Sequence, residues 1–363
     1  MFIDEIKAVD NHCHSIYKEM NHDKFISAFS ETGDDTQLKI HTQETIFYKR
    51  SIKKLSSMFD SEIDSYYNKS REKSMKKLTE LFINKSNLEY LFIDDGFLSE
   101  QFYDISFFKG IVKTKRILRI EWIAEKLIKA KPTFDKFVDE FISELEDDSE
   151  TIISYKSIAA YRCGLDLIKV SFDDVKKEYY RIIDSGESKL TSKILISFLV
   201  ECAFKISSKR KIPIQFHTGF GDNDLDLTKS NPLLLKKLIE ANKSVPVILL
   251  HSSYPFMREA GYMASIYSNV YVDLGLVSPY LSIKGFKNVL SNLFELGPWT
   301  KILYSSDASK IPELYYLSSD LSRSCIHEVL FEFIESGEIN RDDYKYIARG
   351  ILRENAQKLY DLT

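Results

Sequence analysis

The sequence contains few glycines, prolines and cysteines, the residues that interrupt regular structure or cross-link a chain. Its 363 residues include 13 glycines and 8 prolines, which argues against a loop-rich all-β protein. The 4 cysteines are widely scattered, without paired or metal-type spacing, and this usage favours a reducing compartment. The longest apolar stretches, such as 245–250, are too short to cross a bilayer, so a membrane protein is not expected.

An excess of one charge is lacking as well. The 50 basic and 54 acidic side chains leave a formal net charge of −4, which gives no general attraction to nucleic acid or to anionic lipid. The N-terminal segment MFIDEIKAVDNHCH has no basic stretch followed by an apolar one, unlike a secretory signal. We therefore expect a cytoplasmic protein whose partner is a small molecule. Its 21 tyrosines and 24 phenylalanines would also suffice for an apolar patch in a homo-oligomer, although core packing accounts for most such rings.

Short runs rich in β-branched and aromatic residues alternate with helical patterns along the chain. The runs cover 6–14, 89–94, 116–120, 151–158, 212–217, 245–251, 270–274 and 302–306, and examples of the helical patterns are 191–207, 232–242 and 284–296. This alternation predicts a parallel sheet covered by helices. Eight strands favour a closed (β/α)₈ TIM barrel, here a single domain over 1–363.

Two connections are longer than those of a plain barrel. Residues 15–88, after the first strand, include a charged, amphipathic helical stretch at 61–82. Residues 121–150, after the third strand, predict one or two helices and end in the acidic run 144–150. We expect helical insertions with solvated charged faces, the alternative being a cap over the barrel mouth that shapes the pocket.

Polar residues end several of the predicted strands. His12 and His14 are one residue apart, so both imidazoles of a regular strand project to one face, together with Ala8 and Asp10. His217 ends the fifth strand, His251 ends the sixth, and Asp307 follows the eighth. Active-site residues of parallel barrels come from the carboxyl ends of different strands, so this set predicts a metal site at the barrel mouth.

Lys156 lies in the fourth predicted strand, on the face expected to point into the barrel mouth. A buried ammonium is costly without a partner. Carbamylation by carbon dioxide would make it an anionic ligand that bridges two metals. Otherwise the amine contacts a substrate anion, or pairs with a buried acid.

The set formed by His12, His14, Lys156, His217, His251 and Asp307 resembles that of the amidohydrolase superfamily of metal-dependent (β/α)₈ hydrolases. Longer segments resemble the amidohydrolase-2 type: LRIEWIAEKL (118–127), YKSIAAYRCGLDL (155–167), HSSYPFMREAGYMASIYSNVYVDLGLVSP (251–279) and ARGILRENAQKLYDL (348–362). They are similar in particular to the amidohydrolase-like half of nodulin/fluffy-type glutamine synthetase fusion proteins. The resemblance covers 6–362, is weakest over 15–88, and does not involve the glutamine synthetase half of those proteins.

The resemblance implies that His12, His14 and Asp307 bind a catalytic divalent metal, zinc or else manganese, as one ion or two. His217 would be a further ligand, and His251 would bind a second metal or hydrogen-bond the substrate. Such a donor set leaves zinc an open position for water and lowers the pKa of that water toward about 7. Asp307 is then the natural proton acceptor and later donor.

One departure from the family bears on the reaction. Deaminase-type members carry a glutamate shortly after the fifth-strand histidine, whereas this chain has 218–222 as TGFGD. The sequence therefore disfavours deamination. We expect the glycine-flanked turn to bring backbone amides near a ligand, with Asp222 as a substitute acid in the alternative.

Candidate substrate-binding residues follow three strands: Arg119 and Glu121 the third, Tyr161 and Arg162 the fourth, and Tyr254 the sixth. An arginine at a barrel mouth can clamp a carboxylate through two parallel hydrogen bonds, so two of them suggest an acidic or amino-acid-like substrate. The resemblance adds γ-glutamyl amides by association. Alternatively, the arginines pair with nearby acids and Tyr254 caps the next helix.

Together these features predict a metal-dependent hydrolase that cleaves an amide or other C–N bond of a small, carboxylate-bearing substrate, with Asp307, His251 and Lys156 as catalytic residues. A lyase such as a decarboxylase, or a sugar-acid isomerase, is the alternative on the same barrel, because fold alone does not decide the reaction. A catalytically silent binding module is a third possibility, weakened by the completeness of the metal-binding set.

Overall fold

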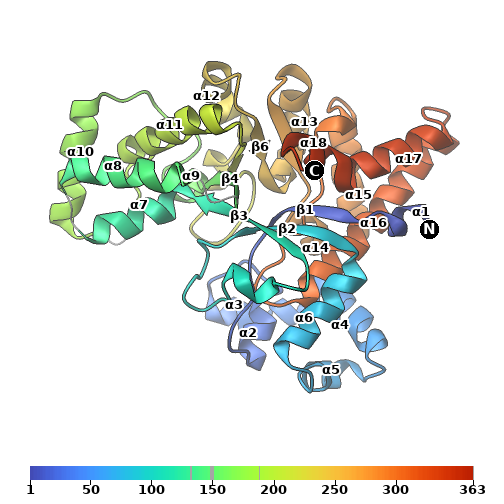
Figure 1. Cartoon of the computed structure of the whole chain (residues 1–363). Coiled ribbons are helices and arrows are strands. Elements are labelled where there is room, and N and C mark those ends of the chain that lie inside the picture. Colours follow the sequence, from blue (N-terminus) through green and yellow to red (C-terminus); the bar gives the residue numbers. More distant parts are fainter. Residues whose placement is uncertain (131–132, 148–150, 188, 363) are drawn as a thin grey trace.

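The computed structural model describes residues 1–130, 133–147, 151–187 and 189–362. Its strands form one parallel sheet in the order β1 to β8, each hydrogen-bonded to the next (Figure 1). They are β1 (Ala8–Cys13), β2 (Leu88–Asp94), β3 (Lys113–Arg119), β4 (Ile152–Ser157), β5 (Ile214–Phe216), β6 (Val247–Leu249), β7 (Val270–Asp273) and β8 (Ile302–Leu303). All eight strands expected from the sequence are present.

The sheet curls into a barrel whose last gap lies between β8 and β1. The segment after β8 bridges this gap, because the backbone amide of Asn11 donates to Tyr304 O at 3.0 Å and that of His14 to Ala308 O at 2.8 Å. In the opposite direction, the amide of Asp307 donates to His12 O at 3.0 Å. This closure confirms the predicted TIM barrel and brings Asp307 beside the two histidines.

Helices surround the barrel (Figure 1). Those before β4 are α1 (Phe2–Glu5), α2 (His22–Ser27), α3 (Asp35–Ile40), α4 (Ile46–Met58), α5 (Tyr66–Ser70), α6 (Met75–Ser86), α7 (Ile120–Lys129) and α8 (Phe134–Leu145). Those after β4 are α9 (Ala159–Arg162), α10 (Phe172–Ser185), α11 (Lys193–Arg210), α12 (Lys236–Ala241), α13 (Met257–Ile266), α14 (Val277–Tyr280), α15 (Ile283–Phe294), α16 (Glu313–Glu335), α17 (Arg341–Arg349) and α18 (Asn355–Leu359). No helix among the described residues is long and apolar enough to cross a membrane.

The first insertion folds as short helices on one side of the barrel, blue to cyan in Figure 1. The helical stretch expected over 61–82 is broken, because α5 ends before Arg71 and α6 begins after Ser74, whose side chain accepts from the amide of Lys77. Arg71 instead turns inward to pair with Glu313 at 2.6 Å. One loop of this insertion reaches the barrel mouth, where the amide of Gly33 donates to Asn223 Oδ1 at 2.7 Å.

The second insertion, expected over 121–150, supplies α7 and α8 within the described residues. These helices pack on each other and on α10 and α11, and contribute no residue to the cavity at the mouth. The alternative of a cap over the mouth is therefore wrong for this segment, which covers the side of the barrel. Part of the predicted acidic run, residues 148–150, lies outside the described residues, as do 131–132.

Apolar side chains fill the barrel interior below the mouth. Val9, Ile117, Ile248 and Leu303 meet there with Tyr360 from the C-terminal segment, while Ala8 packs in the layer between strands and helices. The expected inward position of Ala8 is thus wrong. One extra residue in β1 between Asp10 and Cys13, relative to β2, shifts the alternation of side chains, so that His12 still reaches the interior.

Candidate metal centre

A cavity of about 240 Å³ opens at the carboxyl ends of the strands. Side chains at or after the carboxyl ends of all eight strands line it, among them His14, Lys156, His217, His251 and Asp307. The strand ends that the sequence placed together are therefore together in space. His12 lies just beneath the cavity floor and is fully buried.

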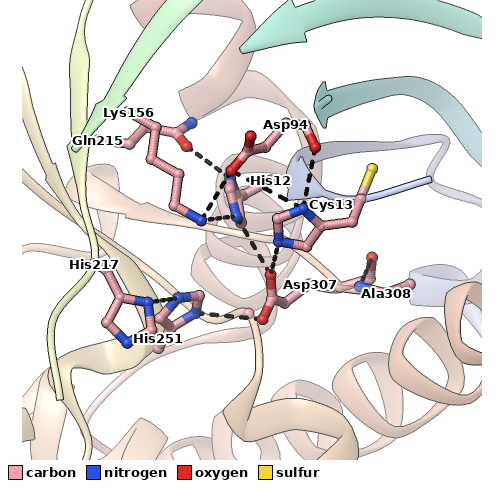
Figure 2. A network of polar contacts seen from close by, with 12 residues as sticks. His12, Cys13, Asp94, Lys156, Gln215, His217, His251, Asp307 and Ala308 are labelled. Carbon is pink, nitrogen blue, oxygen red and sulfur yellow. Dashed lines mark hydrogen bonds and ion pairs between the residues drawn. The ribbon is translucent and has the colours of Figure 1, made fainter. Parts of the chain in front are cut away.

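His12, His14 and Asp307 form the group best suited to hold a metal ion. Their ligand atoms all lie within 4.8 Å of one another. Asp307 Oδ1 is 3.3 Å from His12 Nε2 and 3.4 Å from His14 Nε2 (Figure 2). Two imidazole nitrogens and a carboxylate oxygen are a donor set that zinc and similar divalent metals accept.

Hydrogen bonds on the far side of each ring fix which nitrogen faces this group. His12 Nδ1 lies 2.8 Å from Gln215 Oε1, and His14 Nδ1 lies 3.1 Å from the backbone oxygen of Asp94. Because both partners are acceptors, each Nδ1 carries the proton and each Nε2 presents its lone pair; that of His12 faces Lys156 Nζ at 2.9 Å. Metal-binding histidines are held in this way, with the second ring nitrogen donating to an oxygen.

The buried atoms without hydrogen bonds test whether a metal fits. Asp307 Oδ1 and His251 Nδ1 are both buried and lack a hydrogen-bond partner among the described residues. Unsatisfied buried polar atoms are costly, and a cation between Asp307 Oδ1 and the two Nε2 atoms would satisfy the first of them. The residues present therefore fit a divalent metal.

The other two histidines form a second pair beside this group. His217 Nε2 is 3.0 Å from Phe220 O, so it carries the proton and leaves Nδ1 as an acceptor. That Nδ1 is 3.0 Å from His251 Nε2, and His251 Nδ1 is 3.9 Å from Asp307 Oδ2 (Figure 2). The glycine-flanked turn after β5 thus presents a backbone carbonyl to His217.

Strained backbone holds two of these side chains in place. Asp307 has φ 48° and His251 has φ 64°, left-handed values that non-glycine residues seldom adopt. At His251 the strain is supported by Asp273, whose Oδ1 accepts from the amides of His251 at 3.1 Å and Gly275 at 2.9 Å. Strain of this kind clusters at functional sites.

Asp94, at the end of β2, joins the histidine group to the cationic wall of the cavity. Its Oδ2 is 3.2 Å from Lys156 Nζ and 2.6 Å from Arg119 Nη2. Lys156 Nζ is also 2.9 Å from His12 Nε2. The lysine thus points into the barrel mouth as expected and at the same time pairs with a buried acid, two alternatives that the sequence had kept apart.

Burial and neighbouring charges set the protonation of the site. Burial and the charge of Lys156 lower the pKa of His12 to about 4, and burial lowers the pKa of His251 to about 3 against the attraction of Asp307. Burial alone would raise the pKa of Asp307, but the imidazoles around it, led by that of His251, hold it well below its ordinary value. His12 and His251 are therefore neutral and Asp307 is ionised at neutral pH, as metal binding requires.

The candidate substrate-binding residues separate into two groups. Arg119, Tyr161 and Arg162 line the cavity, although Arg119 is paired with Asp94 and Arg162 lies 3.1 Å from Glu125. The Tyr161 ring packs on His217 with the ring centroids 4.3 Å apart.

Glu121 and Tyr254 do not line the cavity. Glu121 is fully buried and accepts from Ser157 Oγ at 2.7 Å and from the amide of Ile158 at 3.0 Å, so it fixes the end of β4. Tyr254 packs against the ring of Phe220 at 5.5 Å. Both residues therefore make structural contacts behind the cavity instead of lining it.

Sequence reasoning missed several residues of the site, among them Glu31, Asp94, Gln215 and Lys310. Asp94 ends a predicted strand and Gln215 shares the face of His217 on β5, so both carried the signal that identified the histidines. Glu31 and Lys310 line the cavity from loops, and Glu31 accepts from Tyr280 Oη at 2.7 Å. No strand pattern marks such loop residues.

Comparisons with known proteins agree with this geometry. A family model described as amidohydrolase matches residues 202–362. Protein fluG of Emericella nidulans is 28% identical over 396 residues, which cover 98% of this chain and 45% of the relative. The chain thus spans about half the length of that curated relative.

Solved structures extend the likeness over the whole chain. A Lactobacillus casei protein, provisionally described as a metal-dependent hydrolase, is 29% identical with a TM-score of 0.90, covering 99% of this chain and 96% of the other. A uronate isomerase from Thermotoga maritima is 14% identical with a TM-score of 0.69, covering 99% and 95%. At that identity the isomerase shows a shared fold and no more.

Proposed function

The chain is of the amidohydrolase type, and on that premise we propose that it is a metal-dependent hydrolase that cleaves an amide or another C–N bond of a small, carboxylate-bearing substrate. The observation that carries the proposal is the convergence of His12 Nε2 and His14 Nε2 on Asp307 Oδ1, an oxygen without any other partner among the described residues. Zinc suits this donor set best, and manganese is the alternative.

The metal, when bound, would activate a water molecule and polarise the carbonyl of the substrate. His12 and His14 would hold it through Nε2 and Asp307 through Oδ1, and His217 would become a further ligand through Nδ1 only by giving up its contact with His251 Nε2. Asp307 Oδ2 faces away from the two ligand histidines, and it takes the proton of the attacking water and returns it to the leaving nitrogen. His251, fully buried beside Asp307, hydrogen-bonds the substrate.

The charges around the cavity support an amino-acid-like substrate. Both signs are present in its lining: Arg119, Lys156, Arg162 and Lys310 on one hand, Glu31, Asp222 and Asp224 on the other. Cations close to the metal group suit a substrate carboxylate, and acids from the loops suit an ammonium group. A γ-glutamyl amide carries both groups next to a cleavable C–N bond and is the first substrate to test.

The decisive experiment measures metal content and product together. Purified wild type, His12→Ala and Asp307→Asn are loaded with zinc or manganese, dialysed and analysed for bound metal. His41→Ala is the matched control, since His41 is an exposed histidine at the end of α3. Wild type and control should retain metal that both site variants lose.

The products of turnover distinguish the reactions open to this barrel. Release of an amine or ammonia together with a carboxylic acid, from γ-glutamyl amides or other carboxylate-bearing amides, would support hydrolysis. Carbon dioxide from an aromatic or amino acid, or an isomerised sugar acid, would replace it with the lyase or isomerase reaction. Metal binding without turnover of any of these substrates would indicate a binding module, and absence of metal after reconstitution would remove the premise.

A further inference from the structure

We propose that a second cavity, next to the one at the metal centre, binds an organic ammonium group on the amine side of the substrate, and that Glu31 is the residue that selects it. This inference rests on the proposed function and specifies its substrate class: amides whose leaving amine carries a further, positively charged amino group. Glu31 lines both cavities, so they meet at this side chain. The second cavity has a volume of about 480 Å³, within the range of small-molecule sites.

Aromatic rings form the walls of the second cavity. Phe29 and Phe47 come from the first insertion, while Phe220 follows β5 and Tyr280 ends α14. The ring centroids of Phe29 and Phe47 are 5.3 Å apart, and those of Phe47 and Tyr280 are 4.7 Å apart. The ring of Phe220 lies 6.3 Å from that of Tyr280. Faces of aromatic rings attract ammonium groups, so this wall suits a cation as well as its alkyl chain.

Glu31 adds a negative charge to these rings. Its Oε1 accepts from Tyr280 Oη at 2.7 Å, whereas its Oε2 has no hydrogen bond or ion pair with any of the described residues. The cation beside it, Lys310, instead donates to Ser27 O at 2.8 Å and to Ser30 O at 3.3 Å. A carboxylate oxygen left without a partner next to aromatic rings can bind an ammonium group through a charge-assisted hydrogen bond.

The strand order places the second cavity opposite the cationic wall of the first. Arg119 ends β3 and Tyr280 follows β7, and these two strands are four positions apart in the order of eight. The proposed function places the carboxylate of the substrate near cations such as Arg119, so the other end of the substrate extends toward Glu31. In an amide whose acyl part bears the carboxylate, that other end is the amine.

Contacts between the insertion and the barrel hold the second cavity in shape without a ligand. The guanidinium of Arg50, on α4, donates to Leu281 O at 2.9 Å and to Pro279 O at 2.7 Å. At the loop that carries Glu31, Thr32 Oγ1 donates to Asn223 Oδ1 at 3.2 Å. A site formed in advance loses little conformational entropy when the ligand binds. If the rings served only to pack the insertion on the barrel, a carboxylate among them would be a cost without a function.

The experiment measures the binding of butylamine, which is protonated at neutral pH, and of n-butanol, its uncharged counterpart, by calorimetric titration of metal-free and zinc-loaded protein. Glu31→Gln keeps the shape and the acceptor for Tyr280 Oη but removes the charge. Phe47→Leu removes a ring that lines the second cavity and not the first. Glu62→Gln is the matched control, because Glu62 is an exposed glutamate of the same insertion and lines neither cavity. Melting curves confirm that each variant is folded.

We expect butylamine to bind wild type and Glu62→Gln equally, and to bind Glu31→Gln about 10-fold more weakly, since a hydrogen bond between charged groups is lost. Phe47→Leu should weaken binding by about 3-fold. Absence of butylamine binding to wild type, equal affinity of wild type and Glu31→Gln, or equal affinity for butylamine and n-butanol would overturn the proposal. A folded Phe47→Leu with the affinity of wild type would overturn it as well, because the ligand would then lie outside the second cavity.

Turnover tests whether the subsite serves the amine side of the substrate. For zinc-loaded wild type, kcat/KM for the amide of a diamine should exceed that for the amide of the matching monoamine by about 10-fold, and Glu31→Gln should lose this preference. Equal kcat/KM values for the two amides in wild type would refute the assignment to the amine side. Absence of bound metal, or of cleavage of either amide, would count against the proposed function, while the butylamine titration of the metal-free protein decides separately whether the subsite exists.

Discussion

Gln215 offers the sharpest test of how the metal group is built. Its Oε1 is the acceptor for His12 Nδ1 at 2.8 Å, while its Nε2 donates to Asn11 O at 3.0 Å and to Tyr360 Oη at 3.2 Å. The residue is fully buried on β5, two residues before His217. Replacing it by methionine keeps a side chain of similar length but removes the acceptor that fixes the His12 tautomer.

The expected loss can be worked out from these contacts. Removing an oxygen that orients a metal-binding histidine typically costs 10–100-fold in metal affinity, about 1.4–2.7 kcal/mol. The same change removes three hydrogen bonds, those to His12 Nδ1, Asn11 O and Tyr360 Oη, each of which contributes about 1 kcal/mol to stability. Gln215→Met should therefore weaken zinc binding by at least about 10-fold and lower the free energy of unfolding of the metal-free protein by about 3 kcal/mol.

Tyr360→Phe separates the two effects, because it removes the contact with Gln215 Nε2 and leaves Gln215 Oε1 in place as the acceptor for His12 Nδ1. We expect it to lower stability with little change in zinc affinity, whereas Gln215→Glu should retain affinity better than Gln215→Met. Zinc affinity is measured by competition with a chromophoric chelator, and stability by urea unfolding without metal. Equal zinc affinity of wild type and Gln215→Met, within about 3-fold, would refute the assigned role of this hydrogen bond.

Three further predictions follow from the same structure. Chelation of the metal should lower the melting temperature of wild type but not of Asp307→Asn, since a ligand at 100 times its Kd adds about 2.7 kcal/mol of stability; calorimetry with and without chelator tests this. The pKa values of His12, about 4, and His251, about 3, lie below the unfolded value of 6.5. The neutral rings therefore contribute stability to the metal-free protein above pH 6.5, and this stability is lost as the pH falls toward 4 and 3. A melting temperature that stays constant between pH 7 and 4 would contradict this prediction. Gly219→Ala should destabilise more than Gly337→Ala, because an added Cβ at residue 219 lies 2.3 Å from Tyr254 O. At Gly337 the added Cβ meets open space, so that variant loses only the about 1–2 kcal/mol that a side chain costs at a φ of 78°. Equal urea midpoints of the two variants would argue against the close contact at Gly219.

The fold and the histidine set could be predicted because both depend on local pattern. Each barrel strand is an apolar run that ends where the chain leaves the sheet, so a polar residue such as His217 after such a run falls at the mouth. Strand order needed no further information, because consecutive parallel strands with helical crossovers lie side by side. The same logic failed inside β1, where one extra residue changes which side chains face inward, and a single sequence carries no mark of that irregularity.

The partners of the site depend on contacts between distant segments, and this is where prediction from the sequence stopped. Glu31 reaches the cavity only because the loop around it is tied to Asn223, across 190 residues of chain. Arg71 leaves its helix to meet Glu313, which breaks a helix that the local pattern continues. In both cases tertiary contacts contribute more free energy than the local conformational preference that they override.

Buried acids show most clearly why residue type and position alone do not assign roles. Asp94 and Glu121 both lie at or just after strand ends, and both are fully buried. Glu121 spends its two oxygens on Ser157 Oγ and the amide of Ile158, so it secures backbone and has nothing to offer a ligand. Asp94 instead holds two cations that line the cavity, and its backbone oxygen orients a ligand histidine. A buried ion pair gains little stability over a well-packed apolar pair, so its presence under a cavity is better explained by the charges that it keeps in place for the substrate.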